Sequence, residues 1–462
     1  MKKILLKDLI EKCDGKLIIG NELEELNNFS KDTRLIQEND IYVGIKGENY
    51  DGNKLYKEAF ENGAKGCVLD SNVDIDYDYL NNLKDKFIVL VEDTILCLQK
   101  LASYKRSLYD IPVIGVTGSV GKTSTKDIIA SVLSKKYKVL KTIGNYNNHI
   151  GVPLTILSLK DENCLVVEMG MNNLGEISTL SKIARPTVSV ITNVGTAHIG
   201  NLGSRENILK AKLEILDGMD NDRILVINND NDLLHEYYLK NKNNNIKPFG
   251  VMYESDFKPF NIKTDVLSSS YDICIDNKLY NFKINIPGNH FILNSLCALT
   301  IGNIFNIDIE DIKDGIANFE LTKRRMEIEK INSMTIINDC YNANLDSMKG
   351  AINYLSTLKE TRKVAILGDM LELGEYSEEL HTELGKIVKE NNIDILITIG
   401  ENAKNISKSA IDNGMDSDSV YDFDNNKDAL EKIKDIIKPN DTILLKASYG
   451  MNFIEIYNEL KK

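Results

Sequence analysis

The chain has 462 residues, which is too long for one ordinary domain and suggests about three. Charged residues make up 27% and hydrophobic residues 42%, so the protein is globular with material for several cores. The net charge of −13 argues against nucleic acid or an anionic membrane surface as the main partner.

The seven cysteines are scattered along the chain and form no CxxC pair, which indicates neither a zinc knuckle nor a disulfide framework. No stretch approaches 18 apolar residues, and the apolar run before Lys7 is too short for a signal peptide. We therefore expect a cytoplasmic monomer that neither inserts into a membrane nor binds nucleic acid.

Residues 1–107 are expected to form an N-terminal domain. Short apolar runs at 40–47, 63–70 and 86–93 are typical of strands, and the segment 53–63 has a helical pattern.

Residues 108–318 are expected to form a central domain, in which strands and helices alternate. Strand-like runs occur at 111–117, 164–170, 186–195 and 222–230, with helical patterns at 174–183 and 206–216. This alternation predicts a mainly parallel sheet. The segment 240–286 alternates weakly, and we expect antiparallel strands appended to the edge of that sheet.

Residues 319–462 resume the alternation and are expected to form a C-terminal domain. The strand-like runs are 334–340, 363–370, 394–400 and 441–448, and the helical patterns are 347–359, 379–391 and 427–437. The predicted fold class is therefore α/β with three domains. The central domain is a mainly parallel P-loop domain, and the C-terminal domain is Rossmann-like. No GxGxxG follows residues 364–368, so a dinucleotide is not implied.

The segment IPVIGVTGSVGKTSTKD (111–127) predicts a site for a nucleotide triphosphate, because an apolar strand runs into a glycine-rich turn and then a helix. Gly118 and Gly121 let the backbone approach phosphate, while Lys122 can reach the β- and γ-phosphates. The Thr123 hydroxyl can ligate Mg²⁺. Val116 stands where the usual pattern has its first glycine.

Other polar residues follow predicted strands. Glu168 ends a strand in this domain, where an acid can hold Mg²⁺, and His198 lies in a loop of small residues after another strand. Lys210 and Lys212 lie two residues apart on a predicted helix, so at most one can face the site. Each of these features also has an ordinary structural interpretation as a solvated strand end, a structural histidine or a solvated helix face.

The ordered set of motifs resembles the Mur ligases of peptidoglycan synthesis, and within them the ligases that add D-alanyl-D-alanine. The resemblance covers nearly the whole chain and rests on GVTGSVGKTSTK, NNHIGVPLT, VVEMGMNNLGEI, TNVGTAHIGNLGS, AKLEIL, PGNHFILN, RMEI, DCYNANLDSM and ILGDMLELGE. The DNPR-type motif of the tripeptide-forming relative is missing. The resemblance implies ATP and Mg²⁺ as cofactors, with UDP-N-acetylmuramoyl-tripeptide and D-alanyl-D-alanine as substrates.

The resemblance also implies roles for individual residues. The ATP phosphates and Mg²⁺ would be bound by the loop containing Gly118, Ser119, Gly121, Lys122, Thr123 and Ser124. Glu168 and His198 would be magnesium ligands, and Lys212 would act as a carbamate that organises the metal. The catalytic residues would thus be Lys122, Lys212 and His198. Asn294 and the nearby His290 would lie at the adenine, and Arg325 and Asp339 would close over the nucleotide from the last domain.

Substrate residues follow from the same resemblance. Asn342 and Asn344 would receive the dipeptide, and Asn147, Asn148 and Asn172 are further candidates in polar loops. The UDP-sugar would be held by the first domain through Asp32, Thr33, Arg34 and Lys46.

Three motifs depart from the family pattern. Ala447 and Tyr449 stand where KGSR is usual, Leu345 stands where YNANP is usual, and Asn173 stands where the loop usually has histidine. Tyr449 removes a cation from the acceptor side. Two alternatives stay open: a divergent Mur-type ligase using another amine or carboxylate, and a P-loop protein whose ATP binding drives partner switching.

Overall fold

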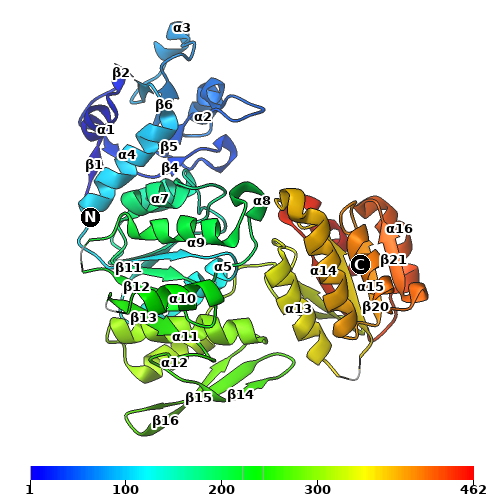
Figure 1. Ribbon diagram of the computed structural model, residues 1–462. Coiled ribbons are helices and arrows are strands. Elements are labelled where there is room, and N and C mark those ends of the chain that lie inside the picture. Colours follow the sequence, from blue (N-terminus) through cyan, green and yellow to red (C-terminus); the bar gives the residue numbers. More distant parts are fainter. Residues whose placement is uncertain (1, 221, 243, 360) are drawn as a thin grey trace.

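The computed structural model describes residues 2–220, 222–242, 244–359 and 361–462. Figure 1 shows three α/β units in chain order: the blue N-terminal unit stands on the central cyan-to-green unit, and the yellow-to-red C-terminal unit lies beside the central one. This confirms the predicted α/β class, while the predicted boundaries at 107/108 and 318/319 stay predictions.

The N-terminal unit contains a five-stranded sheet, parallel except at β2. Its order is β2 (Lys16–Ile19), β7 (Phe87–Val91), β6 (Gly66–Asp70), β5 (Ile41–Val43) and β4 (Phe29–Ser30), while β1 (Ile4–Leu5) and β3 (Glu25–Leu26) form a separate pair. Its helices are α1 (Leu6–Cys13), α2 (Tyr56–Glu61), α3 (Tyr77–Leu80) and α4 (Thr94–Ser107), with 3₁₀ turns η1 (Thr33–Leu35) and η2 (Gly52–Leu55). The Asp93 side chain caps α4 by accepting the N–H groups of Ile95 and Leu96.

The central unit is built on a six-stranded, fully parallel sheet. Its order is β13 (Ile246–Phe249), β12 (Ile224–Asn228), β11 (Val188–Ile191), β8 (Val113–Thr117), β10 (Cys164–Glu168) and β9 (Val139–Lys141). The P-loop strand β8 lies between β10 and β11, the switch point at which ligands bind in open parallel sheets.

Helices connect the parallel strands of the central unit and surround its sheet (Figure 1). They are α5 (Lys122–Leu133), α6 (Gly151–Leu157), α7 (Glu176–Ala184), α8 (Ile199–Leu202), α9 (Arg205–Leu213), η3 (Glu214–Leu216), α10 (Asp232–Lys240), α11 (Asn289–Ile304) and α12 (Ile309–Ala317). Helix α11 packs against α5 and is largely buried, which fits its long apolar run.

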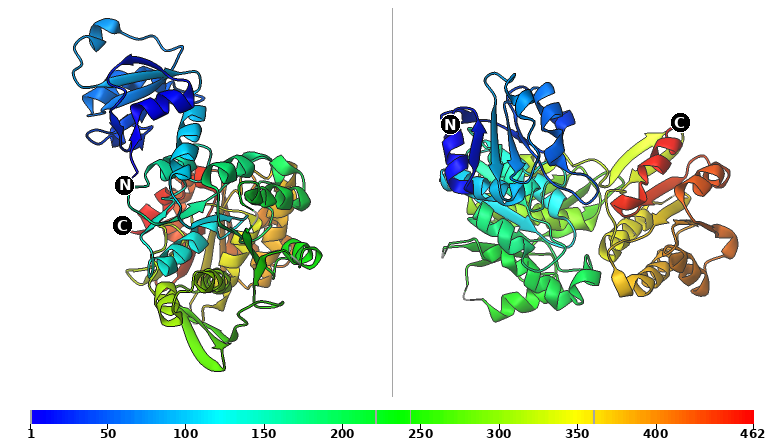
Figure 2. Two further views of the ribbon diagram at one scale, coloured as in Figure 1. Left: turned by 90° about the vertical axis from the view of Figure 1, so that its left-hand side faces the viewer. Right: turned by 90° about the horizontal axis from the view of Figure 1, so that it is seen from above.

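The prediction for residues 240–286 is wrong in part. β13 is indeed at the edge of the central sheet, but it pairs with β12 in parallel. The antiparallel strands β14 (Phe260–Thr264), β15 (Ser269–Ile275) and β16 (Lys278–Ile284) form a separate three-stranded sheet against α11 and α12, and its hairpin projects from the unit (Figure 2). The buried face of β15 and β16, with Tyr271 stacked on Phe282, packs on those helices rather than continuing the sheet.

The C-terminal unit has a second six-stranded sheet, parallel except for its edge strand β17. The order is β17 (Glu327–Ile331), β18 (Met334–Asn338), β22 (Thr442–Lys446), β19 (Lys363–Gly368), β20 (Ile395–Ile399) and β21 (Val420–Phe423). The helical elements are α13 (Leu345–Thr357), η4 (Gly374–Tyr376), α14 (Ser377–Glu390), α15 (Lys404–Asp412), η5 (Ser417–Ser419), α16 (Asn426–Ile436), η6 (Tyr449–Met451) and α17 (Ile454–Leu460). Among the described residues, no helix combines the length and apolar character needed to cross a bilayer.

Candidate active site

The phosphate-binding loop runs from the end of β8 to the start of α5. Gly121 precedes the helix with φ of 83°, a left-handed conformation that glycine adopts without strain. A Cβ atom on Gly118 would lie 1.8 Å from Oγ1 of Thr192, so only glycine fits there. The predicted strand, turn and helix are therefore confirmed as local structure.

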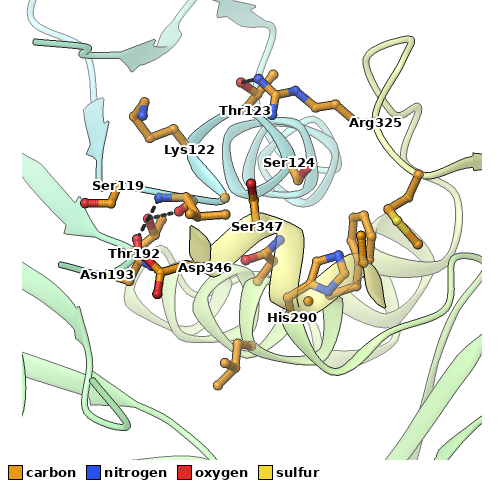
Figure 3. A pocket seen from close by; sticks show the side chains of 18 of the residues that line it. Ser119, Lys122, Thr123, Ser124, Thr192, Asn193, His290, Arg325, Asp346 and Ser347 are labelled. Carbon is orange, nitrogen blue, oxygen red and sulfur yellow. Dashed lines mark hydrogen bonds between the residues drawn. The ribbon is translucent and has the colours of Figure 1, made fainter. Parts of the chain in front are cut away.

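The segment after β11 braces this loop (Figure 3). The N–H of Ser119 donates to the carbonyl of Asn193 at 3.1 Å, and the N–H of Val120 donates to the Asn193 Oδ1 at 2.7 Å. Oγ of Ser119 accepts the N–H of Gly195 at 3.0 Å. Sequence analysis did not identify Asn193 as a site residue, because it lies inside the strand-like run 186–195, whereas the observed strand ends at Ile191.

Lys122 lies at the start of α5 and is poised for an anion. Its Nζ donates to the carbonyl of Gly118 at 2.8 Å, across the loop that it belongs to. Burial lowers the pKa of Lys122, while the charge of Glu168 acts in the opposite direction and that of Arg325 adds to the lowering. A cation held this way is stabilised by the arrival of phosphate charge.

The P-loop, α11 and the C-terminal unit enclose one cavity of about 190 Å³. The predicted residues that line it are Ser119, Gly121, Lys122, Thr123, Ser124, His290, Asn294, Arg325, Asp339, Asn342 and Asn344. The structure thus brings the predicted nucleotide residues and the predicted dipeptide residues together.

Arg325 connects the C-terminal unit to the P-loop. Its Nη2 donates to Oγ1 of Thr123 at 2.8 Å, and its guanidinium lies 4.1 Å from the centre of the Tyr341 ring. A cation over an aromatic face is attracted by the ring electrons, so Tyr341 helps to hold Arg325 over the cavity.

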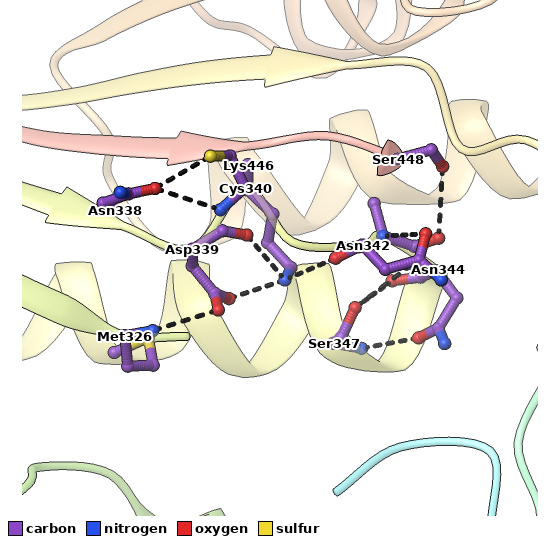
Figure 4. A network of polar contacts seen from close by, with 10 residues as sticks. Met326, Asn338, Asp339, Cys340, Asn342, Asn344, Ser347, Lys446 and Ser448 are labelled. Carbon is purple, nitrogen blue, oxygen red and sulfur yellow. Dashed lines mark hydrogen bonds and ion pairs between the residues drawn. The ribbon is translucent and has the colours of Figure 1, made fainter. Parts of the chain in front are cut away.

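A buried polar network forms the C-terminal wall of the cavity (Figure 4). Nζ of Lys446 lies 2.5 Å from Oδ2 of Asp339 and 3.1 Å from the carbonyl of Asn342. Asn344 caps α13, because its side chain accepts the N–H of Ser347 at 2.9 Å. Sequence analysis did not identify Lys446, which lies inside the strand-like run 441–448 and ends the observed strand β22.

Asp346 makes a second link between the two units. Its Oδ2 accepts the N–H of Thr196 at 3.1 Å, and a Cβ on Gly195 would lie 2.0 Å from that oxygen. Asp346 also lines the cavity, and it lies within the DCYNANLDSM motif without having been singled out.

Glu168 ends β10 outside the lining of the cavity. One carboxylate oxygen, Oε1, accepts from Asn147 Nδ2 at 2.8 Å, whereas Oε2 is buried and has no hydrogen-bond partner among the described residues. The nearest cation to Oε2 is Nζ of Lys126 at 3.8 Å, itself fully buried. Lys126 was missed because its position inside α5 resembles an ordinary helix face.

The structure separates the two lysines of α9. Lys212 is buried, with 1% of its surface exposed, whereas Lys210 is exposed. Burial brings the pKa of Lys212 well below its usual range, and the charge of Lys122 lowers it further. Only Lys212 of the two is therefore buried, and it is not among the residues that line the cavity.

His198 begins α8 with φ of 63° and lies at the contact with the C-terminal unit. Its Nδ1 is 2.8 Å from Oε2 of Glu372. The nearby His198 side chain lowers the pKa of Glu372, although Nδ1 has no aligned hydrogen-bond partner among the described residues.

His290 and Asn294 both lie on α11. His290 packs against Phe291 with ring centres 4.4 Å apart, and burial lowers its pKa to about 4. Asn294 lies beside Gly121, and its Nδ2 is buried without a hydrogen-bond partner in the described part of the chain. That amide is a free donor facing the loop.

The remaining predicted residues lie away from the cavity. Asp32 pairs with Arg34 (Oδ2 to Nη2, 2.6 Å) and lines a groove of about 170 Å³ shared with central residues such as Lys141 and Tyr146. Thr33, Arg34 and Lys46 do not line that groove, although Thr33 donates to Glu58 at 2.7 Å. The polar loop residues also have structural partners: Asn148 accepts the N–H of Gly151 at 2.9 Å, and the Asn172 N–H donates to Glu176 at 3.0 Å.

Oxygen atoms suited to Mg²⁺ are present in the region. Thr123 Oγ1 and the unpartnered Glu168 Oε2 are hard oxygen ligands of the kind that magnesium prefers. Within the described ranges, no group of three His, Cys, Asp or Glu side chains could hold a metal by itself. A metal here needs the threonine hydroxyl, phosphate oxygens or a modified lysine in addition.

Comparison with known proteins places the chain in a family. A family model described as the Mur ligase middle domain matches residues 116–302, and one described as the Mur ligase glutamate ligase domain matches residues 324–449. The UDP-N-acetylmuramoyl-tripeptide–D-alanyl-D-alanine ligase of Bacillus subtilis (strain 168) is 37% identical over 100% of this chain and 99% of its own length. The ligase of the same name from Escherichia coli (strain K12) is 30% identical over 89% of each chain.

Solved structures agree with this placement. MurF from Acinetobacter baumannii matches with a TM-score of 0.87 at 26% identity over 100% of both chains. MurF ligase from Thermotoga maritima in complex with ADP matches with a TM-score of 0.80 at 28% identity, over 94% of this chain and 97% of that one. The chain belongs to the Mur ligase family.

Proposed function

We propose that this chain is an ATP-dependent ligase that joins D-alanyl-D-alanine to UDP-N-acetylmuramoyl-tripeptide in peptidoglycan precursor synthesis. The relatives at 30–37% identity carry the name of that ligase, and the Thermotoga maritima relative is described in complex with ADP. The observation that carries the proposal is the cavity in which the P-loop faces Asn342, Asn344 and Arg325 from another unit. A phosphate site facing an acceptor site is what an acyl-phosphate ligase requires.

The proposed reaction has two steps. A carboxylate oxygen of the tripeptide attacks the γ-phosphorus of ATP, the bond to the β–γ bridging oxygen breaks, and ADP leaves with an acyl phosphate formed. The amine of D-alanyl-D-alanine then attacks the acyl carbon, loses a proton, and displaces phosphate. Both steps gather negative charge at one place, so they need fixed cations and the exclusion of water.

Residues around the cavity supply these needs. Lys122 and the N–H groups of the loop would bind the β- and γ-phosphates, and in doing so Lys122 would exchange its contact with the Gly118 carbonyl for phosphate. Arg325, delivered by the C-terminal unit, would add a second cation. His290 and Asn294 would lie along the nucleoside side, with the free amide of Asn294 as a donor.

Thr123, Glu168, His198 and Lys212 are the proposed holders of Mg²⁺. When bound, Mg²⁺ neutralises charge on the transferring phosphoryl group. Oε2 of Glu168 supports this assignment, because it is buried without a hydrogen-bond partner among the described residues, which is costly even with Lys126 Nζ 3.8 Å away.

We propose that Lys212 is carbamylated. A neutral amine attacks carbon dioxide and loses a proton to give a carbamate anion, and the lowered pKa of Lys212 favours the neutral amine. The side chain of Lys212 is 1% exposed, so the amine lies away from bulk water.

The first unit would hold the UDP-sugar. Asp32 and the groove that it shares with Lys141 and Tyr146 support this role. Thr33 and Arg34 follow Asp32 in sequence, and Lys46 lies further along the same unit. Asn147, Asn148 and Asn172 would contribute polar contacts between this groove and the cavity. We also propose that the protein is cytoplasmic and monomeric. Size-exclusion chromatography with light scattering tests whether it is a monomer.

The test is a substrate panel. The purified protein is incubated with ATP, Mg²⁺, UDP-N-acetylmuramoyl-tripeptide and one dipeptide at a time, and the products are identified by mass. D-alanyl-D-alanine should give the best substrate, and phosphate release should require both the amine and the UDP-linked carboxylate. A P-loop switch would release phosphate without either, and a divergent ligase would prefer another amine.

A further inference from the structure

A short loop of the C-terminal unit docks on the segment that follows β11. This docking loop, residues 372–376, contains η4, and it packs against residues 198–203, which contain α8. The hydroxyl of Tyr376 donates to the carbonyl of Gly203 at 2.7 Å. A Cβ atom on Gly200 would lie 2.6 Å from the backbone nitrogen of Gly374, so the two backbones approach as closely as glycine allows.

The docking brings one titratable pair together. Nδ1 of His198 lies 2.8 Å from Oε2 of Glu372, with 17% of the His198 side chain and 53% of the Glu372 side chain exposed. Nδ1 of His198 is buried and has no aligned hydrogen-bond partner among the described residues. The two groups are therefore within hydrogen-bond distance of each other.

Both residues have unusual backbones. His198 has φ of 63° and Glu372 has φ of 67°, in the left-handed region that residues with side chains seldom adopt. Such conformations persist where the surrounding structure holds them, and they cluster at functional sites. Here each one turns a side chain toward the other across the contact between two units.

We propose that Glu372 is a positioning residue for His198, delivered by docking of the C-terminal unit. Its carboxylate accepts the Nδ1–H of His198, which fixes the tautomer and leaves Nε2 unprotonated for a divalent cation. Metal-binding histidines commonly donate their other N–H to a carboxylate in this way. The inference rests on the metal role proposed above for His198.

The affinity for metal distinguishes a positioning role of Glu372 from a role in docking alone. If closure presents Glu372 to His198, closure and metal binding strengthen each other, since coupling between two binding events is reciprocal. A contact that only held the two units together would alter closure and leave the affinity of the closed form for metal unchanged.

The test measures metal binding directly. Binding of Mn²⁺ to the full-length protein, saturated with ADP, is followed by the loss of the free-ion signal in electron paramagnetic resonance. Glu372→Gln keeps the shape and the docking surface but removes the charge, and it should weaken Mn²⁺ binding 10- to 100-fold, the range typical of such partners. The matched control is Glu375→Gln, an exposed neighbour on the same loop that should bind Mn²⁺ like the parent.

A double-mutant cycle shows whether Glu372 acts through His198. In a His198→Ala background, Glu372→Gln should cause no additional loss, because the residue that it positions is gone. Unchanged Mn²⁺ affinity in Glu372→Gln, or a full additional loss in the His198→Ala background, overturns the proposal.

The failure of the proposed function would look different. If His198→Ala leaves Mn²⁺ binding unchanged, His198 is not a ligand and the positioning role fails with it, whatever the reaction. If the parent protein binds Mn²⁺ as expected but makes no amide product, the ligase assignment fails while the role of Glu372 stands.

Discussion

Replacing Lys212 should lower the activity of the protein much more than its stability. The Lys212 side chain is 1% exposed. Lys212→Met keeps the length and apolar stem and removes the amine, so the free energy of unfolding should change by less than about 1.5 kcal/mol. Activity should fall by a factor of about 10² to 10³, the usual cost of losing one group that stabilises transition-state charge.

Lys212→Ala extends the test by chemical rescue. Truncation leaves space near Lys122, should cost about 2–5 kcal/mol of stability, and should admit a small carboxylate in place of the carbamate. Added formate or acetate should therefore restore part of the rate of Lys212→Ala and none of the rate of Lys212→Met.

The assay combines product mass with carbon-13 magnetic resonance after incubation with labelled bicarbonate, where the parent should show a carbamate signal. Lys210→Ala is the control, because that side chain is exposed on the other face of α9. Full activity of Lys212→Met, or equal losses in both lysine variants, would refute the assignment.

Three further predictions follow from the geometry. Lys122→Ala should lower the rate by at least about 10² with an unchanged melting temperature, and retention of more than about a tenth of the rate would remove this lysine from the mechanism. Tyr449 is 63% exposed and its ring lies 6.2 Å from that of Tyr341, so Tyr449→Arg should place a cation near the acceptor side. The substitution should lower the KM for D-alanyl-D-alanine about tenfold, equivalent to about 1.4 kcal/mol of binding free energy, and leave the kinetic parameters for ATP unchanged. An unchanged KM would show that other residues bind the acceptor. The pKa of His290 is lowered to about 4 from 6.5, so the unfolded state takes up a proton first as the pH falls. Stability should drop between about pH 6.5 and pH 4, by at most about 2 kcal/mol at pH 5, and His290→Asn should remove this part of the loss in urea titrations.

The sequence predicted the parts of the site that depend on local order. The strand, glycine turn and helix around Lys122 are contiguous, so their pattern alone locates the phosphate loop. Helical periodicity also showed that Lys210 and Lys212 face different sides. It could not say which is buried, because that depends on how α9 packs in the folded unit.

Contacts between distant segments could not be predicted from local pattern. Arg325 reaches Thr123 across 202 positions, and Lys446 reaches Asp339 across 107. The separate sheet of β14, β15 and β16 was missed for a related reason, since alternation predicts strands but not the surface on which they pack.

Transfer of oxygen from substrate to phosphate tests the central claim most directly. The terminal carboxylate of UDP-N-acetylmuramoyl-tripeptide is labelled with oxygen-18 and incubated with the protein, ATP, Mg²⁺ and D-alanyl-D-alanine. An acyl-phosphate route predicts one labelled oxygen in each phosphate released and one amide product for each phosphate. Unlabelled phosphate, or phosphate released without amide product, would contradict the proposed reaction.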